Sequence, residues 1–229
     1  AVIRDTPHLI WILVSKRPEN YERYLPSDWG EGYPNVWMLV SVEDQPSADH
    51  RIPILLDTPA ALRGASAEPL LAGVNFAPWL PGCHECAVEC GWRSGDAPPE
   101  EKCGWCGAVS ATHGEFCAAC GGQDFSGVCP RCDANVVQNH PDTPCLNWII
   151  VGGQSGHGAQ DSHLAHHRGI IAQCRAAGVP VFEKQLGARP VDENGRVLKL
   201  KHPKGGNPAE WPPDLQGVRE YPVIERAAA

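Results

Sequence analysis

The sequence lacks any hydrophobic run that approaches the roughly 18 residues of a membrane span. It also lacks a visible secretory signal at its start, so we expect no membrane partner and a cytoplasmic location. An excess of positive charge is missing too, and the net charge of -8 gives no chain-wide reason to expect a polyanion partner. The first residues, AVIRDTPHLIWILVSK, contain no methionine and enter a strand almost at once. This start predicts that the chain comes from the middle of a longer gene product.

Cysteine, in contrast, is abundant and unevenly distributed. Nine of the eleven cysteines lie between Cys83 and Cys132, and eight of them form four Cys-x-x-Cys pairs: Cys83/Cys86, Cys103/Cys106, Cys117/Cys120 and Cys129/Cys132. Disulfide frameworks belong mainly to small secreted domains, whereas a thiol pair on one tight turn presents both sulfurs to one cation. Four repeated pairs therefore favour metal ligation over disulfides or a redox dithiol.

The cysteine-rich segment 81–146 is predicted to be an inserted zinc-ribbon module with about two structural zinc ions. One site would use Cys103, Cys106, Cys117 and Cys120, and its ribbon would be enclosed by a second site made of Cys83, Cys86, Cys129 and Cys132. Pairing of the motifs in sequential order stays open, as does substitution of a ligand by Cys90, Cys145, His84, His113 or His140. Four protein ligands leave no open position for catalysis, and metal binding would fold a segment poor in large aliphatic residues. Nine acids against three basic residues favour a protein partner for this insert over nucleic acid.

The segments on either side of the cysteine-rich segment are richer in large apolar residues. Near-continuous apolar runs are typical of parallel strands that are covered on both faces, and five such runs occur, at residues 8–16, 35–44, 61–71, 147–156 and 179–187. Helical stretches between them predict an α/β fold, interpreted as a partial (β/α) barrel, with a doubly wound sheet as the alternative. The expected organisation is a first barrel segment (1–80), the zinc insert (81–146), a second barrel segment (147–190), and a hairpin and tail (191–229).

Polar residues recur where each predicted strand ends, and ligands of such folds bind at the carboxyl ends of the strands. The candidates for catalysis are Glu43, Glu68 and Lys184. The candidates for substrate or cofactor binding are Lys16, Arg17, Ser41, Gly152, Gly153, Gln154, Ser155, His163 and Gln185. The glycines of GGQSG (152–156) would let backbone amides approach a ligand, although a plain tight turn explains them as well. We expect Glu43, Glu68 and Lys184 to line one polar cavity, with salt bridges that close the barrel as the alternative.

Local signals complete the expectations for the flanks. In the stretch SADHRIPILLDT a serine is predicted to cap the helix, and Ser162 is a possible N-cap of the helix that ends near Gly178. His166 and His167 are interpreted as part of a hydrated helix face. The tail is predicted to form a hairpin that turns at residues 193–195, and its Lys199, Lys201, His202 and Lys204 form a local basic patch.

Several segments, taken in series, resemble the phage gp-thirty-seven/gp-sixty-eight family: ILVSKRPEN, NVWMLVSVEDQPSADHRIPILLDTPAALRGASAEPLL, WIIVGGQSG, CRAAGVPVFEKQLG and KGGNPAEWP. Members of that family typically carry a three-cysteine motif like the iron–sulfur motif of radical S-adenosylmethionine enzymes. The resemblance implies a radical-enzyme-like barrel with an iron–sulfur cluster and S-adenosylmethionine, in the cytoplasm of a host cell. It maps the family's polar strand-end positions onto Lys16, Arg17, Glu43, Glu68, Ser155, His163, Lys184 and Gln185.

Two departures limit what the resemblance implies. The chain has no Cys-x-x-x-Cys-x-x-Cys, since Cys83, Cys86 and Cys90 show the reverse spacing, and Gln154 stands where the family commonly has Glu. A radical-type cluster would therefore need a segment outside this chain. The leading hypothesis is the later portion of a radical S-adenosylmethionine-like enzyme that modifies nucleic acid or nucleotides. The alternatives are a non-radical, base-exchange-type barrel enzyme on nucleic acid and a non-catalytic zinc-ribbon interaction protein.

Overall fold

The structure is a computed structural model that describes residues 2–81 and 144–223. The chain divides into two compact units. One consists of residues 1–76, 146–175 and 179–229, and the other of residues 77–145 and 176–178. The second unit contributes the short helix η2 (Ala77–Trp79) to the described residues. All eight cysteines of the predicted zinc sites lie outside the described residues.

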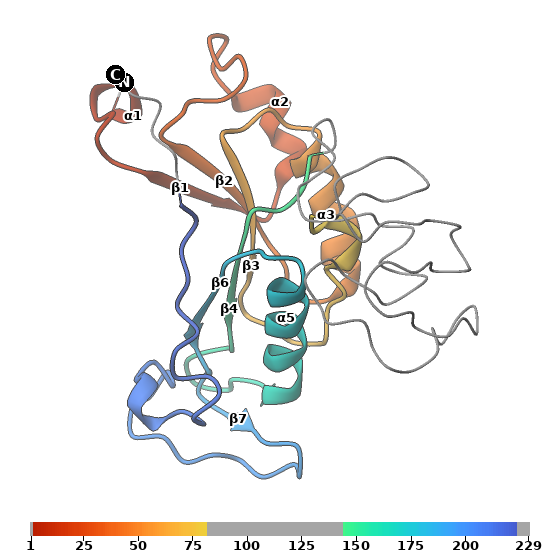
Figure 1. Ribbon diagram of the computed structural model, residues 1–229, viewed down its shortest axis with the longest axis vertical. Coiled ribbons are helices and arrows are strands. Elements are labelled where there is room, and N and C mark those ends of the chain that lie inside the picture. The colour runs from red at the N-terminus through yellow and green to blue at the C-terminus, as the bar shows by residue number, and fades with distance from the viewer. Residues whose placement is uncertain (1, 82–143, 224–229) are drawn as a thin grey trace, which may run out of the picture. The chain divides into compact units, whose positions relative to one another are not determined.

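The first unit contains a five-stranded sheet with helices, which confirms the predicted α/β class (Figure 1). Its strands are β1 (Trp11–Ser15), β2 (Val36–Ser41), β3 (Leu62–Ala67), β4 (Trp148–Gly152) and β6 (Val181–Gln185). They lie in the order β1-β2-β3-β4-β6, and each neighbouring pair is parallel. Each of the five predicted apolar runs therefore contains one strand of this sheet. A shorter pair joins β5 (Ser162–His163) to β7 (Pro190–Val191).

Helices lie before, between and after the strands of the first unit. They are α1 (Val2–Asp5), η1 (Pro18–Asn20), α2 (Tyr21–Tyr24), α3 (Gln45–Leu56), α5 (Leu164–Ala176) and η3 (Pro208–Glu210). The two long helices, α3 and α5, lie on the same side of the strands in Figure 1. The predicted serine cap of α3 is wrong: Asp44 is the N-cap, and Ser47 lies one turn inside the helix as the other half of a capping box. In the described ranges, no helix is long and apolar enough to span a membrane.

The two faces of the sheet differ in what covers them. The helix α5 buries Leu164, Ile170 and Ile171 on one side. Register partners in a parallel sheet share a face, and the other face carries a packed hydrophobic cluster formed by Trp37, Leu39, Leu62, Trp148, Ile150 and Phe182. We call this the aromatic face. It continues onto β1, where Ile12 and Val14 lie in register with Trp37 and Leu39.

The C-terminal segment packs against β6. The predicted hairpin is present, since Val191 bridges Val197 and Gly195 adopts a φ of +76° in the turn between them. Further along, the chain runs antiparallel to β6, with backbone hydrogen bonds from Glu183 to Val218 and from Glu220 to Val181. The free edge of β6 is therefore covered by the protein's own tail.

Candidate functional site

The aromatic face becomes polar toward the carboxyl ends of its strands. Two residues beyond Val14, Leu39 and Phe182, on the same face, stand Lys16, Ser41 and Lys184. Parallel strands end at one edge of a sheet, so these polar residues share that edge with the ends of β3 and β4. We call it the carboxyl edge. Two clusters of charged side chains lie there.

The first cluster is built around Glu68, directly after β3. Its Oε2 accepts a hydrogen bond from Lys184 Nζ at 2.9 Å, and its Oε1 accepts one from Gln185 Nε2 at 2.9 Å. Gln185 Nε2 also donates to the carbonyl oxygen of Gly153 at 3.2 Å. The side chain of Glu68 is 19% exposed and that of Lys184 is 54% exposed. Residues more than a hundred positions apart thus form one half-buried ion pair that a ligand can reach.

Gly152 explains how Glu68 reaches across the sheet. β4 lies between β3 and β6, so a side chain from β3 must pass over β4 to contact Lys184. A Cβ on Gly152 would lie 3.2 Å from both Cγ and Cδ of Glu68, which is closer than ordinary van der Waals contact. The missing side chain at this position therefore makes room for Glu68. The sequence singled out Gly152 as a ligand contact, and the structure shows it supporting the Glu68 side chain.

The second cluster surrounds Glu43, after β2. Arg51 of α3 donates to Glu43 Oε2 at 2.6 Å, and Lys16 pairs with Oε1. Burial opposes ionisation of this carboxyl, but the hydrogen bonds from Lys16 and Arg51 outweigh it and lower the pKa of Glu43 below its usual value. Arg51 was not predicted from the sequence. A cation two helical turns into the helix that follows Glu43 is a weak signal, because its direction depends on how the helix packs.

The predicted catalytic residues therefore fall into two ion-pair clusters. Glu68 and Lys184 contact each other, whereas Glu43 contacts Lys16 and Arg51. Both clusters follow strands of the same parallel sheet and lie at its carboxyl edge.

Two hydroxyl groups lie on the strands that lead to Glu43 and Glu68. Ser41 and Ser66 are register partners at the ends of β2 and β3, and each is 7% exposed. Among the described residues, neither hydroxyl has a hydrogen-bond partner. In the described part of the chain, Glu183 Oε1 is the only fully buried side-chain nitrogen or oxygen atom without a partner, so the hydroxyl oxygens of Ser41 and Ser66 keep some exposure and can contact a bound molecule. Ser41 was a predicted binding residue.

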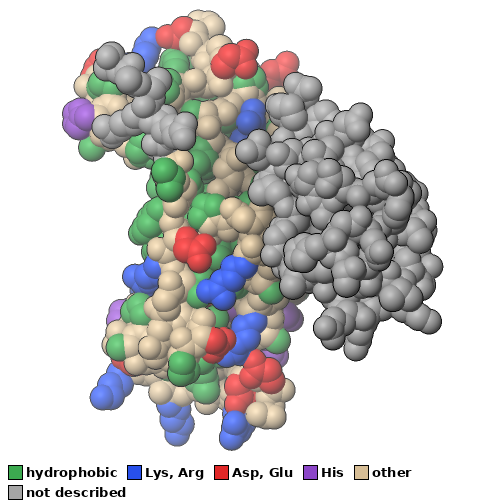
Figure 2. Space-filling view, in the orientation of Figure 1, with side chains coloured by type: hydrophobic (Ala, Val, Ile, Leu, Met, Phe, Trp, Pro, Cys, Tyr) green, Lys and Arg blue, Asp and Glu red, His purple; other side chains and the backbone are tan. Residues whose placement is uncertain are grey.

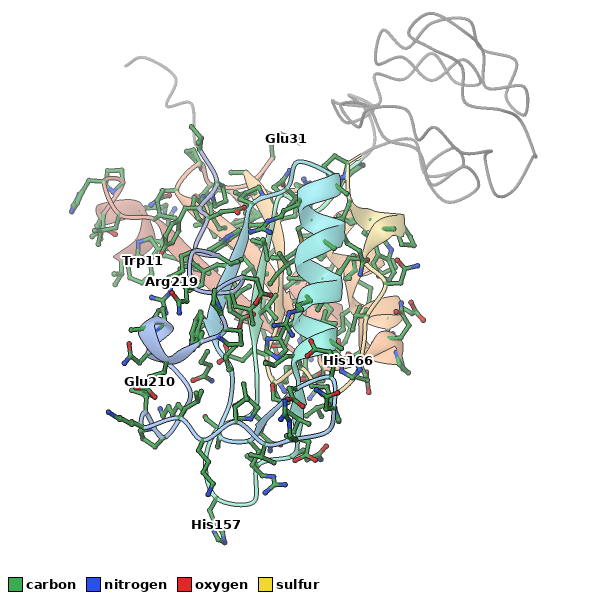
Figure 3. The ribbon with its side chains drawn as sticks, turned by 60° about the horizontal axis from the view of Figure 1, so that its bottom comes forward. Trp11, Glu31, His157, His166, Glu210 and Arg219 are labelled. Atoms are coloured by element: carbon green, nitrogen blue, oxygen red, sulfur yellow. The ribbon has the colours of Figure 1, made fainter. Side chains whose placement is uncertain are left out.

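Of the remaining predicted residues, Gly153 contributes its carbonyl oxygen to the first cluster, and the side chains of the others make contacts outside both clusters. Arg17 pairs with Glu19 and is 75% exposed, and the side chain of Gln154 accepts a hydrogen bond from the backbone of Gln160. Ser155 is exposed on the loop after β4, whose His157 projects away from the strands in Figure 3. His163 is exposed, with its ring 5.4 Å from that of His166, which lies in the first turn of α5. Gly153 packs against Ser162 and Leu186.

A buried chain of polar side chains supports the carboxyl edge from beneath. Ser162 Oγ lies 2.8 Å from His167 Nε2, and His167 Nδ1 lies 2.9 Å from Glu183 Oε2. These residues are at most 1% exposed. The predictions that Ser162 caps α5 and that His167 belongs to a hydrated face are therefore wrong. His167 lies on the inward face of α5 with Ile170, Ile171 and Cys174, a periodicity that the apolar pattern of the helix already contains.

Glu183 supplies the carboxyl group of this polar chain, and its side chain is fully buried. Burial raises its pKa, an effect that the charge of Glu68 reinforces and that His167 and Arg219 oppose. Its Oε1 is buried and has no hydrogen-bond partner in the portion of the chain that the structure describes. Because Glu183 directly precedes Lys184 and Gln185, its anchoring fixes the backbone that carries both.

Comparison with known proteins places the chain in a family. A family model described as DUF5131, protein of unknown function, matches residues 1–209, which include both clusters and the buried polar chain. The chain belongs to the DUF5131 family. No curated protein and no solved structure matches it.

The geometry of this DUF5131 protein suits binding of a polar molecule at the carboxyl edge. Carboxylates that already accept hydrogen bonds from cations and amides can exchange these partners for hydroxyl or ammonium groups of a ligand. Lys184, once released from Glu68, can pair with a carboxylate or a phosphate. The hydroxyls of Ser41 and Ser66 add neutral donors and acceptors beside them.

Proposed function

We propose that this protein supplies the later strands of a (β/α)-barrel enzyme whose carboxyl edge binds a nucleotide-like polar ligand. The observation that carries the proposal is the convergence of Glu68, Lys184 and Gln185 over Gly152. Such a convergence needs three strands and a glycine at one position. The side chain of Lys184 stays about half exposed in this ion pair, so a ligand can reach the charged groups.

The order of the strands supports the barrel over a doubly wound sheet. In a doubly wound fold the strand order reverses at a switch point, where the ligand binds. Here five parallel strands follow one another in sequence order without a reversal. Consecutive strands of a (β/α) barrel have this arrangement, and their carboxyl ends form the active face of such enzymes.

S-adenosylmethionine, which the family resemblance implies, has chemical groups that fit these residues. The carboxylate of Glu68 suits its ribose hydroxyls or its ammonium group, and Lys184 suits its carboxylate. Ser41, Ser66 and Gln185 offer further hydrogen bonds. Ile150 and Phe182, the two partly buried members of the aromatic face, provide an apolar surface for the adenine ring.

The iron–sulfur cluster does not find ligands among the described residues. These residues include two cysteines, Cys145 and Cys174, which are both buried. Burial raises the pKa of Cys174 to about 12, which opposes the thiolate form that ligates iron. Cys83, Cys86 and Cys90 lie outside the described residues. We therefore propose no step that uses a cluster held by the described residues of the chain.

Binding of adenosyl ligands tests the proposal. Isothermal titration calorimetry on the full chain would use S-adenosylmethionine, S-adenosylhomocysteine and adenosine monophosphate. We expect Glu68→Gln to weaken binding about tenfold or more, because hydrogen bonds to a charged group contribute about 1.5–3 kcal/mol. Lys184→Gln should weaken binding of all three ligands, because each carries a carboxylate or a phosphate.

A matched control removes a charge at the opposite end of the sheet. Arg4 pairs with Asp28, and its helix α1 is held by Asn35 just before β2 begins, so it lies at the amino ends of the strands. Arg4→Gln should leave the affinity unchanged. The proposal fails if the wild-type chain binds none of the three ligands, or if Glu68→Gln binds them as tightly as the wild type does.

A further inference from the structure

The tail of the protein carries a concentrated set of unpaired cations. Three of the six lysines of the chain, Lys199, Lys201 and Lys204, lie within six residues, and all three are exposed. Across residues 2–81 and 144–223, none of these three amines forms a salt bridge, whereas Lys16 and Lys184 each pair with a glutamate. We call residues 199–204 the basic loop.

The conformation of the basic loop is fixed by hydrogen bonds that point inward. Gly205, with a φ of +62°, donates to the carbonyl of His202, and its own carbonyl accepts from Leu186 N at 3.0 Å and from Trp211 Nε1 at 2.8 Å. The ring nitrogen Nδ1 of His202 accepts from Gly206 N at 3.0 Å. The loop is therefore held in place before any partner binds, which reduces the entropy cost of binding.

The acids near the basic loop already have partners other than its lysine amines. Glu210, labelled beside η3 in Figure 3, accepts hydrogen bonds from the backbone of Lys201 and His202 and from the side chain of Asn207. Asp214 and Glu193 both pair with Arg168. The positive charge of the three lysines is thus left available to an external anion. Figure 2 shows Lys and Arg side chains that project from the lower end of the body, where the tail lies.

The basic loop borders the carboxyl edge. The hydrogen bond between Leu186 and Gly205 places it two residues beyond Lys184 along the chain that continues from β6. A Cβ on Gly205 would lie 2.6 Å from the carbonyl oxygen of Gly187, and one on Gly187 would lie 2.9 Å from that of Gln154. Glycines at these positions let the loop pack directly against the segments that follow β4 and β6.

The overall negative charge does not oppose an anionic partner here. Nine of the 27 acids and three of the 19 Lys and Arg residues belong to segment 81–146, so the rest of the chain holds 18 acids and 16 basic residues. Outside that segment the sequence is close to neutral. Charges are screened beyond about 10 Å at 0.1 M salt, so the local lysines dominate the potential that a phosphate meets at the loop.

We propose that the basic loop binds the phosphate backbone of a single-stranded nucleic acid, one nucleotide of which enters the carboxyl edge beside Glu68. This inference names the substrate class of the site and rests on the proposed function. Lysines act as point charges on successive phosphates, and a strand without a paired partner can present an unstacked nucleotide to a site. The loop positions the strand, while the Glu68 cluster contacts the nucleotide.

Fluorescence anisotropy with a labelled 20-nucleotide single-stranded DNA tests the inference on the full chain between 50 and 200 mM salt. The variant Lys201→Gln/Lys204→Gln removes two cations without touching the backbone hydrogen bonds of the loop. The slope of log affinity against log salt should become shallower by about 1.4, since each phosphate contact contributes about 0.7 for single strands. The control, Arg4→Gln/Arg175→Gln, removes two exposed charges away from the carboxyl edge and should bind as the wild type does.

The outcomes separate the basic loop from the proposed ligand site. An unchanged salt slope in the lysine variant, an equal loss in the control, or competition by poly-glutamate as strong as that by the oligonucleotide would each overturn the inference. Calorimetry with adenosine monophosphate on the same variants isolates the site, because the lysine variant should keep this affinity and Glu68→Gln should lose it. If the wild type binds adenosine monophosphate but no oligonucleotide, the inference fails and the proposed function stands. If lysine-dependent binding of DNA occurs while Glu68→Gln binds adenosine monophosphate normally, the proposed function fails.

Discussion

Two adjacent glycines, Gly152 and Gly153, serve different purposes at the end of β4. The space at Gly152 is taken by the Glu68 side chain, whose flexible end can move aside. The space at Gly153 is taken by Ser162 Oγ and by the backbone carbonyl of Leu186, at 2.4 and 2.5 Å from an added Cβ. One glycine therefore serves the site, and the other serves the packing of the fold.

The two alanine variants should consequently behave differently. Gly153→Ala should lower the free energy of unfolding by about 1–3 kcal/mol or more, because backbone must shift to accept the methyl group. Gly152→Ala should lower it by less than about 1 kcal/mol but displace the Glu68 carboxylate and weaken ligand binding. Urea denaturation and calorimetry measure the two effects. Equal stability of the two variants would contradict the assigned roles.

Glu183 should leave a signature in the pH dependence of stability. Its pKa is raised in the folded protein above its normal value of 4.5, chiefly by burial. The folded state then binds more protons than the unfolded state, so the free energy of unfolding should fall as the pH rises from about 4.5 toward the raised pKa. In Glu183→Gln this decline should disappear, because the amide does not ionise.

The Glu183→Gln experiment needs an exposed acid as its control. Glu31, which projects from the surface in Figure 3, provides it, and Glu31→Gln should keep the wild-type decline. Carboxyls with a lowered pKa, such as Asp44 and Asp214, act in a separate window, because their contribution is lost only as the pH falls below about 3.8. A Glu183→Gln variant that retains the decline above pH 4.5 would show that the buried carboxyl does not cause it.

At the scale of the element, α3 connects helix capping to the carboxyl edge. The helix begins at Asp44, whose Oδ1 accepts a hydrogen bond from Ser47 N at 2.9 Å, while Ser47 Oγ accepts one from Asp44 N at 3.1 Å. Two turns later, Arg51 pairs with Glu43, the residue directly before the cap. The start of α3 and the Glu43 cluster therefore depend on the same local geometry.

Loss of the cap should be measurable. Asp44→Ala should lower the free energy of unfolding by about 1 kcal/mol, and Asp44→Asn, which keeps an oxygen acceptor, should lower it by less. Asp49 lies on the exposed side of the same helix and accepts a hydrogen bond from Gln45, so Asp49→Ala supplies the control. In urea denaturation, an Asp44→Ala variant as stable as Asp49→Ala would contradict the importance of the capping box.

At the scale of the whole molecule, the cysteine-rich segment is expected to fold around metal independently of the sheet. The full chain should contain about two zinc ions and no iron, because four Cys-x-x-Cys pairs complete two closed Cys₄ sites. Elemental analysis of purified protein measures both metals. Stoichiometric iron, or a folded sample without metal, would refute the zinc prediction.

The same prediction has a control within the chain. Cys117→Ser should release zinc and remove hydrogen-exchange protection from segment 81–146, since metal binding and folding of such a segment are one event. Protection of β2, β3 and β4 should persist, because their core residues, among them Leu39, Ile149 and Val151, are fully buried without metal. Loss of protection in the strands as well would show that the insert and the sheet fold together.

The sequence alone determined the strands and their shared edge. Runs such as NVWMLVSV and NWIIVGG are apolar at consecutive positions, which suits strands covered on both faces. Such a run can be recognised from neighbouring residues alone, without knowledge of the tertiary structure. The sequence also placed Glu68, Lys184 and Gln185 at strand ends, because the ends of parallel strands follow directly from the ends of the apolar runs. Whether the zinc ribbon forms is likewise a matter of cysteine spacing, and it stays a prediction.

Only the tertiary structure decided which of these residues meet. The sequence could not show that Glu43 and Glu68 belong to different ion-pair clusters. Which cation each carboxylate contacts depends on the strand order, on the space above Gly152 and on the packing of α3, which places Arg51 beside Glu43. The sequence also predicted that His167 is exposed to solvent, although it lies on the buried side of α5, where it contacts Glu183 and Ser162. Pairings across 116 positions, such as Lys184 with Glu68, are fixed by long-range packing, and local propensity carries no information about them.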